Sequence, residues 1–123
     1  MKLLIVDDSE NIQTAWRKFC LLIDRCKIVS ESSNLDRAVE AVDKIKPDVI
    51  ISNFRLEDGT ALDLLQRLGK SKPLVIILSY YHKSMIKDAC LEAGADYFLQ
   101  KTNDFDRLRE ILETHSKQIA ASE

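Results

Sequence analysis

Five side chains that can do chemistry stand at or just after the end of a short apolar run: Asp7, Asp8, Asn53, Ser79 and Lys101. Two adjacent carboxylates suit a hard divalent ion such as Mg²⁺, which keeps several waters and takes one or two protein carboxylates. A lysine is a point charge that suits phosphate, and a serine hydroxyl can hydrogen-bond a phosphoryl oxygen. These residue types predict a site for Mg²⁺ and a phosphoryl group, provided that the fold brings them together.

Each of these side chains also has an ordinary structural interpretation. Asp8 or the following Ser9 would cap a helix well, since Asp and Ser are favoured at that position. Ser79 taken alone is a strand-end serine, and Lys101 taken alone is a solvated lysine. Their joint placement at successive apolar runs favours a shared site over these separate interpretations.

The apolar runs have the length and composition of strands that are buried on both faces. Such strands are short and rich in Val and Ile, and the runs are Leu3–Val6, Lys27–Glu31, Val49–Ser52, Leu74–Ser79 and Tyr97–Gln100. Between them, apolar residues recur at the spacing of one helix face. These helical stripes span Ile12–Leu22, Leu35–Ile45, Leu62–Leu68, Ile86–Ala93 and Phe105–His115.

Strands that alternate strictly with helices predict an α/β fold of the (βα)5 type, with a parallel sheet covered by helices on both faces. Right-handed crossovers leave few arrangements, and we expect a doubly wound five-stranded sheet of order 2-1-3-4-5 in a single domain over residues 1–123. The functional crevice of such a sheet lies beyond the carboxyl ends of its strands. All five chemically active side chains are therefore expected there.

The composition excludes several classes of protein. The formal net charge is -2 and there is no run of Lys and Arg, so a direct nucleic-acid partner is not expected. The apolar start is too short for a signal peptide or a membrane span. Three cysteines without a C-x-x-C motif do not suggest a disulfide framework and favour a reducing, cytoplasmic location.

The sequence resembles the receiver domain of two-component response regulators over nearly all of its length. The motifs that carry the resemblance are LLIVDDSE (Leu3–Glu10), PDVIISNFRLEDG (Pro47–Gly59), VIILSYY (Val75–Tyr81) and GADYFLQK (Gly94–Lys101). The resemblance implies a flavodoxin-like or CheY-like fold and a phosphorelay signalling module that is not an enzyme. It also implies a sensor histidine kinase or phosphotransfer protein as the upstream partner.

The resemblance implies a role for each strand-end residue. Asp7 and Asp8 correspond to the acidic pair that holds Mg²⁺. Asn53 stands at the phosphoacceptor position, and the backbone carbonyl of Arg55 is a further metal ligand. Ser79 and Lys101 correspond to the two residues that contact the phosphoryl group.

The resemblance also implies a face for a downstream protein partner, formed by the fourth helix, the fifth strand and the fifth helix. Phe98 falls on the position of the switch aromatic of the family. Tyr97 and Tyr80 are further candidates for this face, because aromatic residues are enriched at interfaces. The alternative interpretation is that Phe98 belongs to the core.

Asn53 is the largest departure from the family, which has aspartate at that position. Covalent catalysis by aspartate needs the charged carboxylate, whereas an amide oxygen is a weak nucleophile and gives no stable acyl phosphate. The change also removes a negative charge beside Asp7, so Mg²⁺ binding is expected to weaken. Lys101 can still donate a hydrogen bond to the Asn53 oxygen.

Three smaller departures surround Asn53. Glu57 stands where the family often has proline, and Tyr80 follows the serine where a small residue is usual. The bulk of Tyr80 is expected to narrow access to the site. Thr102 replaces the usual proline after Lys101, so that peptide bond is expected to be trans.

Two origins of Asn53 fit the sequence. The chain is either a natural pseudo-receiver or a receiver whose acceptor aspartate was replaced by experiment. A phosphorylation-independent interaction scaffold is the main alternative function. A phosphatase with an aspartyl nucleophile would need a D-x-D order after the first strand, but the order here is Asp7-Asp8-Ser9. A flavin or dinucleotide binder is rejected because the same loop contains no glycine.

Overall fold

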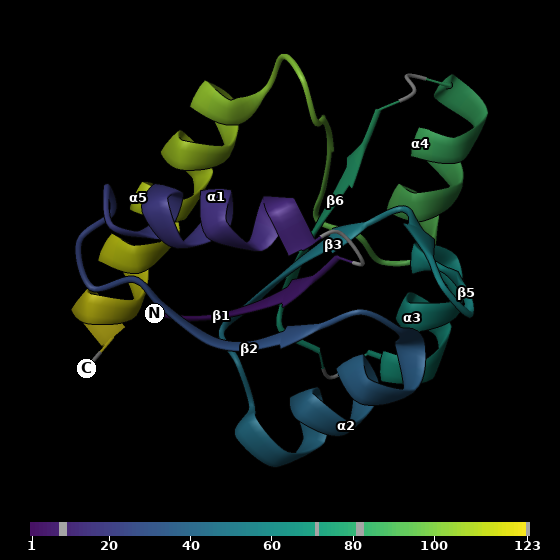
Figure 1. Ribbon diagram of the computed structural model, residues 1–123, viewed down its shortest axis with the longest axis horizontal. Coiled ribbons are helices and arrows are strands. Elements are labelled where there is room, and N and C mark those ends of the chain that lie inside the picture. The colour runs from purple at the N-terminus through teal and green to yellow at the C-terminus, as the bar shows by residue number, and fades with distance from the viewer. Residues whose placement is uncertain (8–9, 71, 81–82, 123) are drawn as a thin grey trace.

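The structure is a computed structural model that describes residues 1–7, 10–70, 72–80 and 83–122. Five parallel strands form one sheet in the order β2-β1-β3-β6-β7 (Figure 1). Their bounds are Lys2–Val6 for β1, Lys27–Ser32 for β2, Val49–Asn53 for β3, Leu74–Ser79 for β6 and Tyr97–Gln100 for β7. In sequence order along the sheet this is 2-1-3-4-5, so the predicted fold is confirmed.

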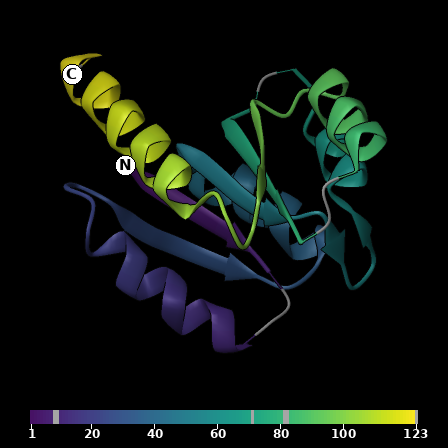
Figure 2. The same ribbon diagram turned by 90° about the horizontal axis from the view of Figure 1, so that it is seen from above.

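In the described residues, four helices lie between strands and a fifth follows the last strand, and together they cover both faces of the sheet. They are α1 (Glu10–Cys20), α2 (Leu35–Ile45), α3 (Ala61–Leu68), α4 (Ser84–Glu92) and α5 (Phe105–Ser122). The helices α1 and α5 pack on one face, and α2, α3 and α4 pack on the other (Figure 2). This is the doubly wound arrangement that right-handed crossovers produce.

Alternate residues of each strand supply two separate core layers. Leu4 and Val6 of β1 pack toward α2 and α3, whereas Leu3 and Ile5 pack toward α1 and α5. Both sets are 1% exposed or less. Period-2 alternation explains the pattern, and burial of both faces explains why the strands are continuous apolar runs.

Local signals set the start of α2. The Asn34 side chain accepts a hydrogen bond from the Arg37 backbone N–H at 3.0 Å, which caps the helix. An N-cap side chain satisfies a donor that has no partner inside the helix. The helix ends at Ile45, and the following residue, Lys46, has a left-handed φ of 53° and donates its N–H to the Val42 carbonyl.

The end of α1 and the loop after β3 differ from expectation. The stripe through Leu22 predicted a longer helix, but α1 ends at Cys20 and Leu22 is 57% exposed in the following turn. Trp16 and Cys20 occupy the core-facing positions instead. The loop after β3 contains a small hairpin of β4 (Arg55–Leu56) and β5 (Gly59–Thr60), which apolar periodicity does not detect in two-residue strands.

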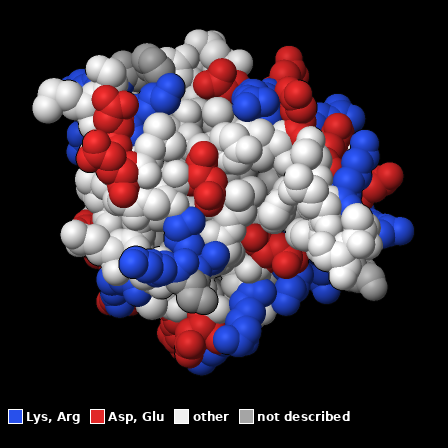
Figure 3. All heavy atoms as spheres, turned by 180° about the vertical axis from the view of Figure 1, so that it is seen from behind, with Lys and Arg blue, Asp and Glu red and all other residues white. Residues whose placement is uncertain are grey.

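Charged residues of both signs are interspersed on the surface. Figure 3 shows lysines and arginines beside aspartates and glutamates rather than one basic stripe on the face in view. Within the described residues, none of the helices combines the length and apolar character that crossing a bilayer requires.

Candidate functional site

The carboxyl ends of four strands place the predicted site residues at one end of the sheet. Asp7 directly follows β1, Asn53 ends β3, Ser79 ends β6 and Lys101 directly follows β7. The parallel register aligns these ends, since Asn53 pairs with Leu78 and Ser79 pairs with Gln100. Because register is set by the buried faces of the strands, packing of the core positions these polar side chains.

Lys101 lies at the centre of this group. Its Nζ donates to Asp7 Oδ2 at 2.9 Å and to Asn53 Oδ1 at 2.6 Å. Its backbone N–H donates to the Ser79 carbonyl at 2.8 Å, which ties the end of β6 to the same residue. The hydrogen bond to Asn53 that the sequence allowed is therefore present.

The ion pair between Lys101 and Asp7 is almost completely buried. The side chains of Lys101 and Asp7 are only 4% and 2% exposed, so Lys101 is not the solvated lysine of the ordinary interpretation. Removing two charges from water is costly and needs good geometry together with additional hydrogen bonds. The Asn53 oxygen supplies one such hydrogen bond to the buried ammonium.

The other two predicted metal ligands are Asp8 and the backbone carbonyl of Arg55. Asp8 lies outside the described residues. Arg55 begins β4, two residues beyond Asn53, and the role of its carbonyl stays a prediction. Among the described residues, there is no group of three or more His, Cys, Asp or Glu side chains that could hold a metal ion. Asp7 and Asn53 bring two oxygens to one ammonium, and oxygens of this kind are the ligands that Mg²⁺ prefers.

A partly open pocket of about 350 Å³ adjoins Asn53. Its lining comes from the ends of β3 and β6 and from the start of α4: Asn53, Phe54, Arg55, Leu78, Ser79, Tyr80, Lys83 and Ile86. The Tyr80 side chain borders this pocket and is 58% exposed. The centre of its ring lies 5.0 Å from the Lys101 ammonium, within the range of a cation–π contact.

The two aromatic residues of β7 face opposite sides of the sheet. Phe98 is 7% exposed and packs in the core layer with Cys90 of α4 and Ala95. Tyr97 is partly buried against the other layer, with the Cζ of Arg107 5.9 Å from its ring centre. The core interpretation of Phe98 therefore holds for this structure, and roles in switching or partner binding stay predictions.

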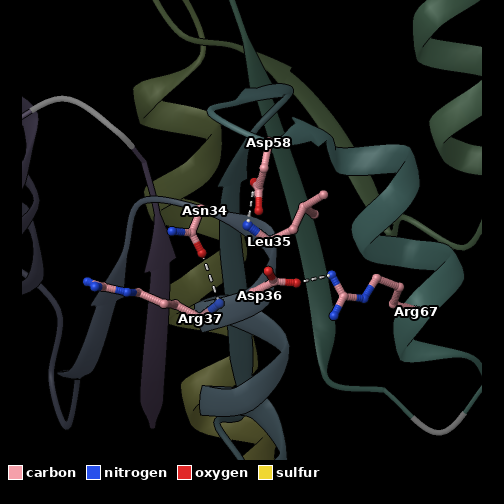
Figure 4. A network of polar contacts seen from close by, with 6 residues as sticks. All are labelled: Asn34, Leu35, Asp36, Arg37, Asp58 and Arg67. Carbon is pink, nitrogen blue, oxygen red and sulfur yellow. Dashed lines mark hydrogen bonds and ion pairs between the residues drawn. The ribbon is translucent and has the colours of Figure 1, made fainter.

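Sequence reasoning missed a polar network that ties the loop after Asn53 to α2 and α3. Asp58 Oδ1 accepts a hydrogen bond from the Leu35 backbone N–H at 2.8 Å, and Arg67 forms a 2.8 Å ion pair with Asp36 (Figure 4). In sequence, Asp58-Gly59 indicated only a turn. A carboxylate beside a helix N-terminus is favourable. Because Asp58 and Leu35 are 23 residues apart in the sequence, the local pattern around Asp58 did not indicate this contact.

Gly59 allows this loop to pack closely. A Cβ atom at Gly59 would lie 2.6 Å from Asp63 Oδ2 and 2.6 Å from Leu35 Cδ1. Asp63 also accepts a hydrogen bond from the Thr60 backbone N–H at 2.9 Å at the start of α3. A side chain at this position would therefore require the ends of the Asp63 and Leu35 side chains to move.

The model of the response regulator receiver domain family matches residues 3–113, so the chain belongs to this family. Among curated proteins, the response regulator protein PilR of Pseudomonas aeruginosa is 33% identical over 116 residues, covering 92% of this chain and 25% of PilR. The chemotaxis protein CheY of Listeria monocytogenes is 28% identical over 120 residues, covering 95% of this chain and 99% of CheY.

A solved structure supports the fold independently of close sequence similarity. The signal receiver domain of the response regulator NarL from Mycobacterium tuberculosis superposes with a TM-score of 0.84 at 18% identity. The match covers 94% of this chain and 95% of that chain. Receiver domains of two-component systems generally bind Mg²⁺ and interact with histidine kinases or phosphotransfer proteins and with downstream effectors, and this chain is a member of that class.

Proposed function

We propose that this chain is a phosphorelay receiver whose phosphoryl-accepting reaction is disabled at position 53. The observation that carries the proposal is the bond between Lys101 Nζ and Asn53 Oδ1 at 2.6 Å, in the place where a receiver has its acceptor aspartate. The amide keeps the size and the acceptor oxygen of that side chain, but it lacks the charge that a carboxylate nucleophile uses. Both origins of Asn53, natural or engineered, lead to this behaviour for the chain with Asn53.

We also propose roles for the residues that surround Asn53. Lys101 holds Asp7 and Asn53 together through the two hydrogen bonds that its ammonium donates. Ser79, at the end of β6 and on the wall of the pocket, is the candidate hydroxyl for a phosphoryl oxygen. With position 53 neutral, the equilibrium between the inactive and active conformations is set by protein contacts rather than by phosphorylation.

The proposed ligands of Mg²⁺ are Asp7, Asp8, Asn53 and the Arg55 carbonyl. In a working receiver, this ion would neutralise charge around the phosphoryl group. The Asn53 oxygen and the Asp7 carboxylate converge within 3 Å of one cation, as the hydrogen bonds of Lys101 show. An amide oxygen is a weaker ligand than a carboxylate, because it brings no charge. We therefore propose that Mg²⁺ binding is weakened rather than abolished.

A downstream protein is proposed to bind the face of α4, β7 and α5. The strand β7 lies at the edge of the sheet, and the two helices flank it. Tyr97 is partly accessible on this strand, and Tyr80 is exposed beside α4. We also propose a cytoplasmic location, which fits three free thiols and a reducing compartment.

Phosphorylation by a small-molecule donor tests the proposal. The protein with Asn53 is incubated with Mg²⁺ and acetyl phosphate, and its intact mass is measured. We expect no phosphoryl adduct. The Asn53→Asp variant restores the carboxylate nucleophile and is expected to gain one phosphoryl mass under the same conditions.

Each other outcome has a definite meaning. A phosphoryl adduct on the protein with Asn53 would mean that another residue is the acceptor, and the proposed mechanism would be wrong. An Asn53→Asp variant that stays unlabelled would favour a natural pseudo-receiver in which Tyr80 and Glu57 also block the reaction.

Calorimetric titration with Mg²⁺ adds a second measurement. The variant should bind roughly tenfold more tightly, because a full charge near the cation contributes a kcal/mol or more at the dielectric of a protein surface.

A further inference from the structure

Two cysteines that are separate in the sequence pattern lie together at the far end of α1. The Sγ atoms of Cys20 and Cys26 are 2.7 Å apart, and all three cysteines of the chain are free thiols. Cys20 is the last residue of α1 and is 6% exposed, whereas Cys26 directly precedes β2 and is half-buried. Their spacing is not a C-x-x-C motif, so the sequence did not indicate this contact.

Several hydrogen bonds hold the turn between these cysteines in place. Inside it, the Ile23 N–H donates to the Cys20 carbonyl at 3.1 Å, and Arg25 has a left-handed φ of 60°. From α5, Ser116 Oγ donates to the Asp24 carbonyl at 3.0 Å. The N-terminal ammonium donates to the Arg25 carbonyl at 2.5 Å. Contacts from two distant segments therefore fix the positions from which the two thiols approach.

We propose that Cys20 and Cys26 form a reversible dithiol–disulfide site. The sulfur atoms already face one another, and the S–S bond of about 2.03–2.05 Å requires only a small further approach. This site lies at the amino-terminal ends of the strands, since Cys26 precedes β2, whereas Asn53 and Lys101 lie at the carboxyl ends. The two sites therefore lie at opposite ends of the sheet. Intracellular disulfides of this kind are typically transient and redox-sensing.

The oxidant is a low-molecular-weight disulfide such as oxidised glutathione, and the reaction is two successive thiol–disulfide exchanges. Cys26 is the more accessible thiol, so its thiolate attacks one sulfur of the small disulfide and releases one thiol. The Cys20 thiolate then attacks the Cys26 sulfur and releases the second thiol. The protein loses two protons and two electrons, and the small disulfide takes up both and becomes two thiols.

The chemical surroundings of Cys26 affect the rate of this reaction. Burial, together with the neighbouring Cys20 thiol, raises the pKa of the Cys26 thiol above its ordinary value. The thiolate is the attacking form, so exchange is expected to be slow at neutral pH and faster in mildly alkaline buffer. An excess of a small thiol such as reduced glutathione is expected to reverse the exchange and to reduce the disulfide.

The test measures which thiols remain after oxidation. The full chain is treated with oxidised glutathione at mildly alkaline pH, quenched with acid, unfolded, alkylated with N-ethylmaleimide and weighed by intact mass spectrometry. The reduced protein takes three alkyl groups, one for each cysteine. The oxidised protein is expected to take one, on Cys90.

Tryptic digestion identifies the pair directly. Cleavage after Lys18, Arg25 and Lys27 separates the peptide Phe19–Arg25 from the peptide Cys26–Lys27. A disulfide between Cys20 and Cys26 keeps these two peptides linked until a reductant is added. An unchanged count of three alkyl groups with no linked peptide overturns the proposal, as does a linkage that includes Cys90.

Two variants test the order of the steps. Cys20→Ser removes the resolving thiol, so the variant is expected to accumulate a mixed disulfide of glutathione on Cys26. Cys90→Ser is the matched control, and it is expected to form the linked peptides as the parent protein does. If the parent protein itself stops at the mixed disulfide on Cys26, the pair cannot close and the proposal is wrong.

Discussion

Lys101 and Asn53, 48 residues apart in the sequence, are joined by a 2.6 Å hydrogen bond at the carboxyl ends of β7 and β3. The same ammonium bonds Asp7, which is 94 residues away. A single buried cation therefore connects three of the strands that form the floor of the site. The amide at position 53 takes part in this connection through its side-chain oxygen.

Loss of the Lys101 ammonium is expected to destabilise the fold. In Lys101→Met, the buried Asp7 carboxylate loses its ion pair with Lys101, and breaking a buried pair in this way typically costs about 3–5 kcal/mol. Urea unfolding followed by circular dichroism measures the free energy of unfolding. The matched control is Lys44→Met, which removes the exposed pair with Glu40 and should leave the unfolding midpoint unchanged.

A double-mutant cycle separates this pair from general damage to the site. Asp7→Asn removes the buried charge that Lys101 neutralises. If the pair is the cause, adding Asp7→Asn to Lys101→Met should cost much less than the sum of the two single changes. Additive losses would show that the two side chains stabilise the protein independently.

The Asp58 cap on α2 is expected to contribute to stability by a local mechanism. Asp58→Ala leaves the Leu35 N–H without its acceptor, and loss of such a capping acceptor costs about 0.5–2 kcal/mol. Glu57→Ala is the matched control, because it removes the same charge from the neighbouring position of the same exposed loop. Equal losses of unfolding free energy in the two variants would show that charge, and not the hydrogen bond, is responsible.

Stability is expected to fall in alkaline solution when the protein is kept reduced. Burial raises the pKa of the Cys90 thiol, so the folded state retains this proton at pH values where the unfolded chain, with a thiol pKa of about 8.5, has lost it. The contribution is fully present below that pH and is lost as the pH rises toward the folded-state pKa. Linkage limits the slope to about 1.4 kcal/mol per pH unit for one thiol.

Urea unfolding at several pH values, with reductant present, measures this slope. Cys90→Ala removes the thiol, so its free energy of unfolding should depend less on pH above about 8.5 than that of the parent, whatever its absolute stability. An identical slope in the two proteins would contradict the assignment to Cys90.

Tyr80 is expected to slow phosphorylation once a nucleophile is restored. The ring borders the pocket beside Asn53 and lies over the Lys101 ammonium. In the Asn53→Asp background, Tyr80→Ala should raise the rate of labelling by acetyl phosphate roughly two- to fivefold. This range corresponds to about 0.5–1 kcal/mol, the strength of an exposed cation–π contact. Tyr80→Phe keeps the ring and should label at the unchanged rate, and a faster Phe variant would implicate the hydroxyl instead.

Local patterns in the sequence were sufficient to predict the sheet and the position of its site. Continuous Val- and Ile-rich runs indicated strands buried on both faces, and their alternation with helical stripes allowed few topologies. Because parallel strands in register end together, Asp7, Asn53, Ser79 and Lys101 could be expected at one end of the sheet. The peptide bond between Lys101 and Thr102 is trans, as predicted from the absence of a proline at position 102.

Contacts between segments far apart in the chain were decided only by the tertiary structure. The end of α1 before Leu22 and the approach of Cys20 to Cys26 depend on the turn that α5 and the N-terminus hold. The cap of α2 by Asp58 depends on how the loop after β3 packs. Periodicity reports which face of an element is apolar, but which side chain contacts which depends on packing between elements. The sequence alone therefore determined where the site lies, and packing decided that Lys101 is buried between Asp7 and Asn53.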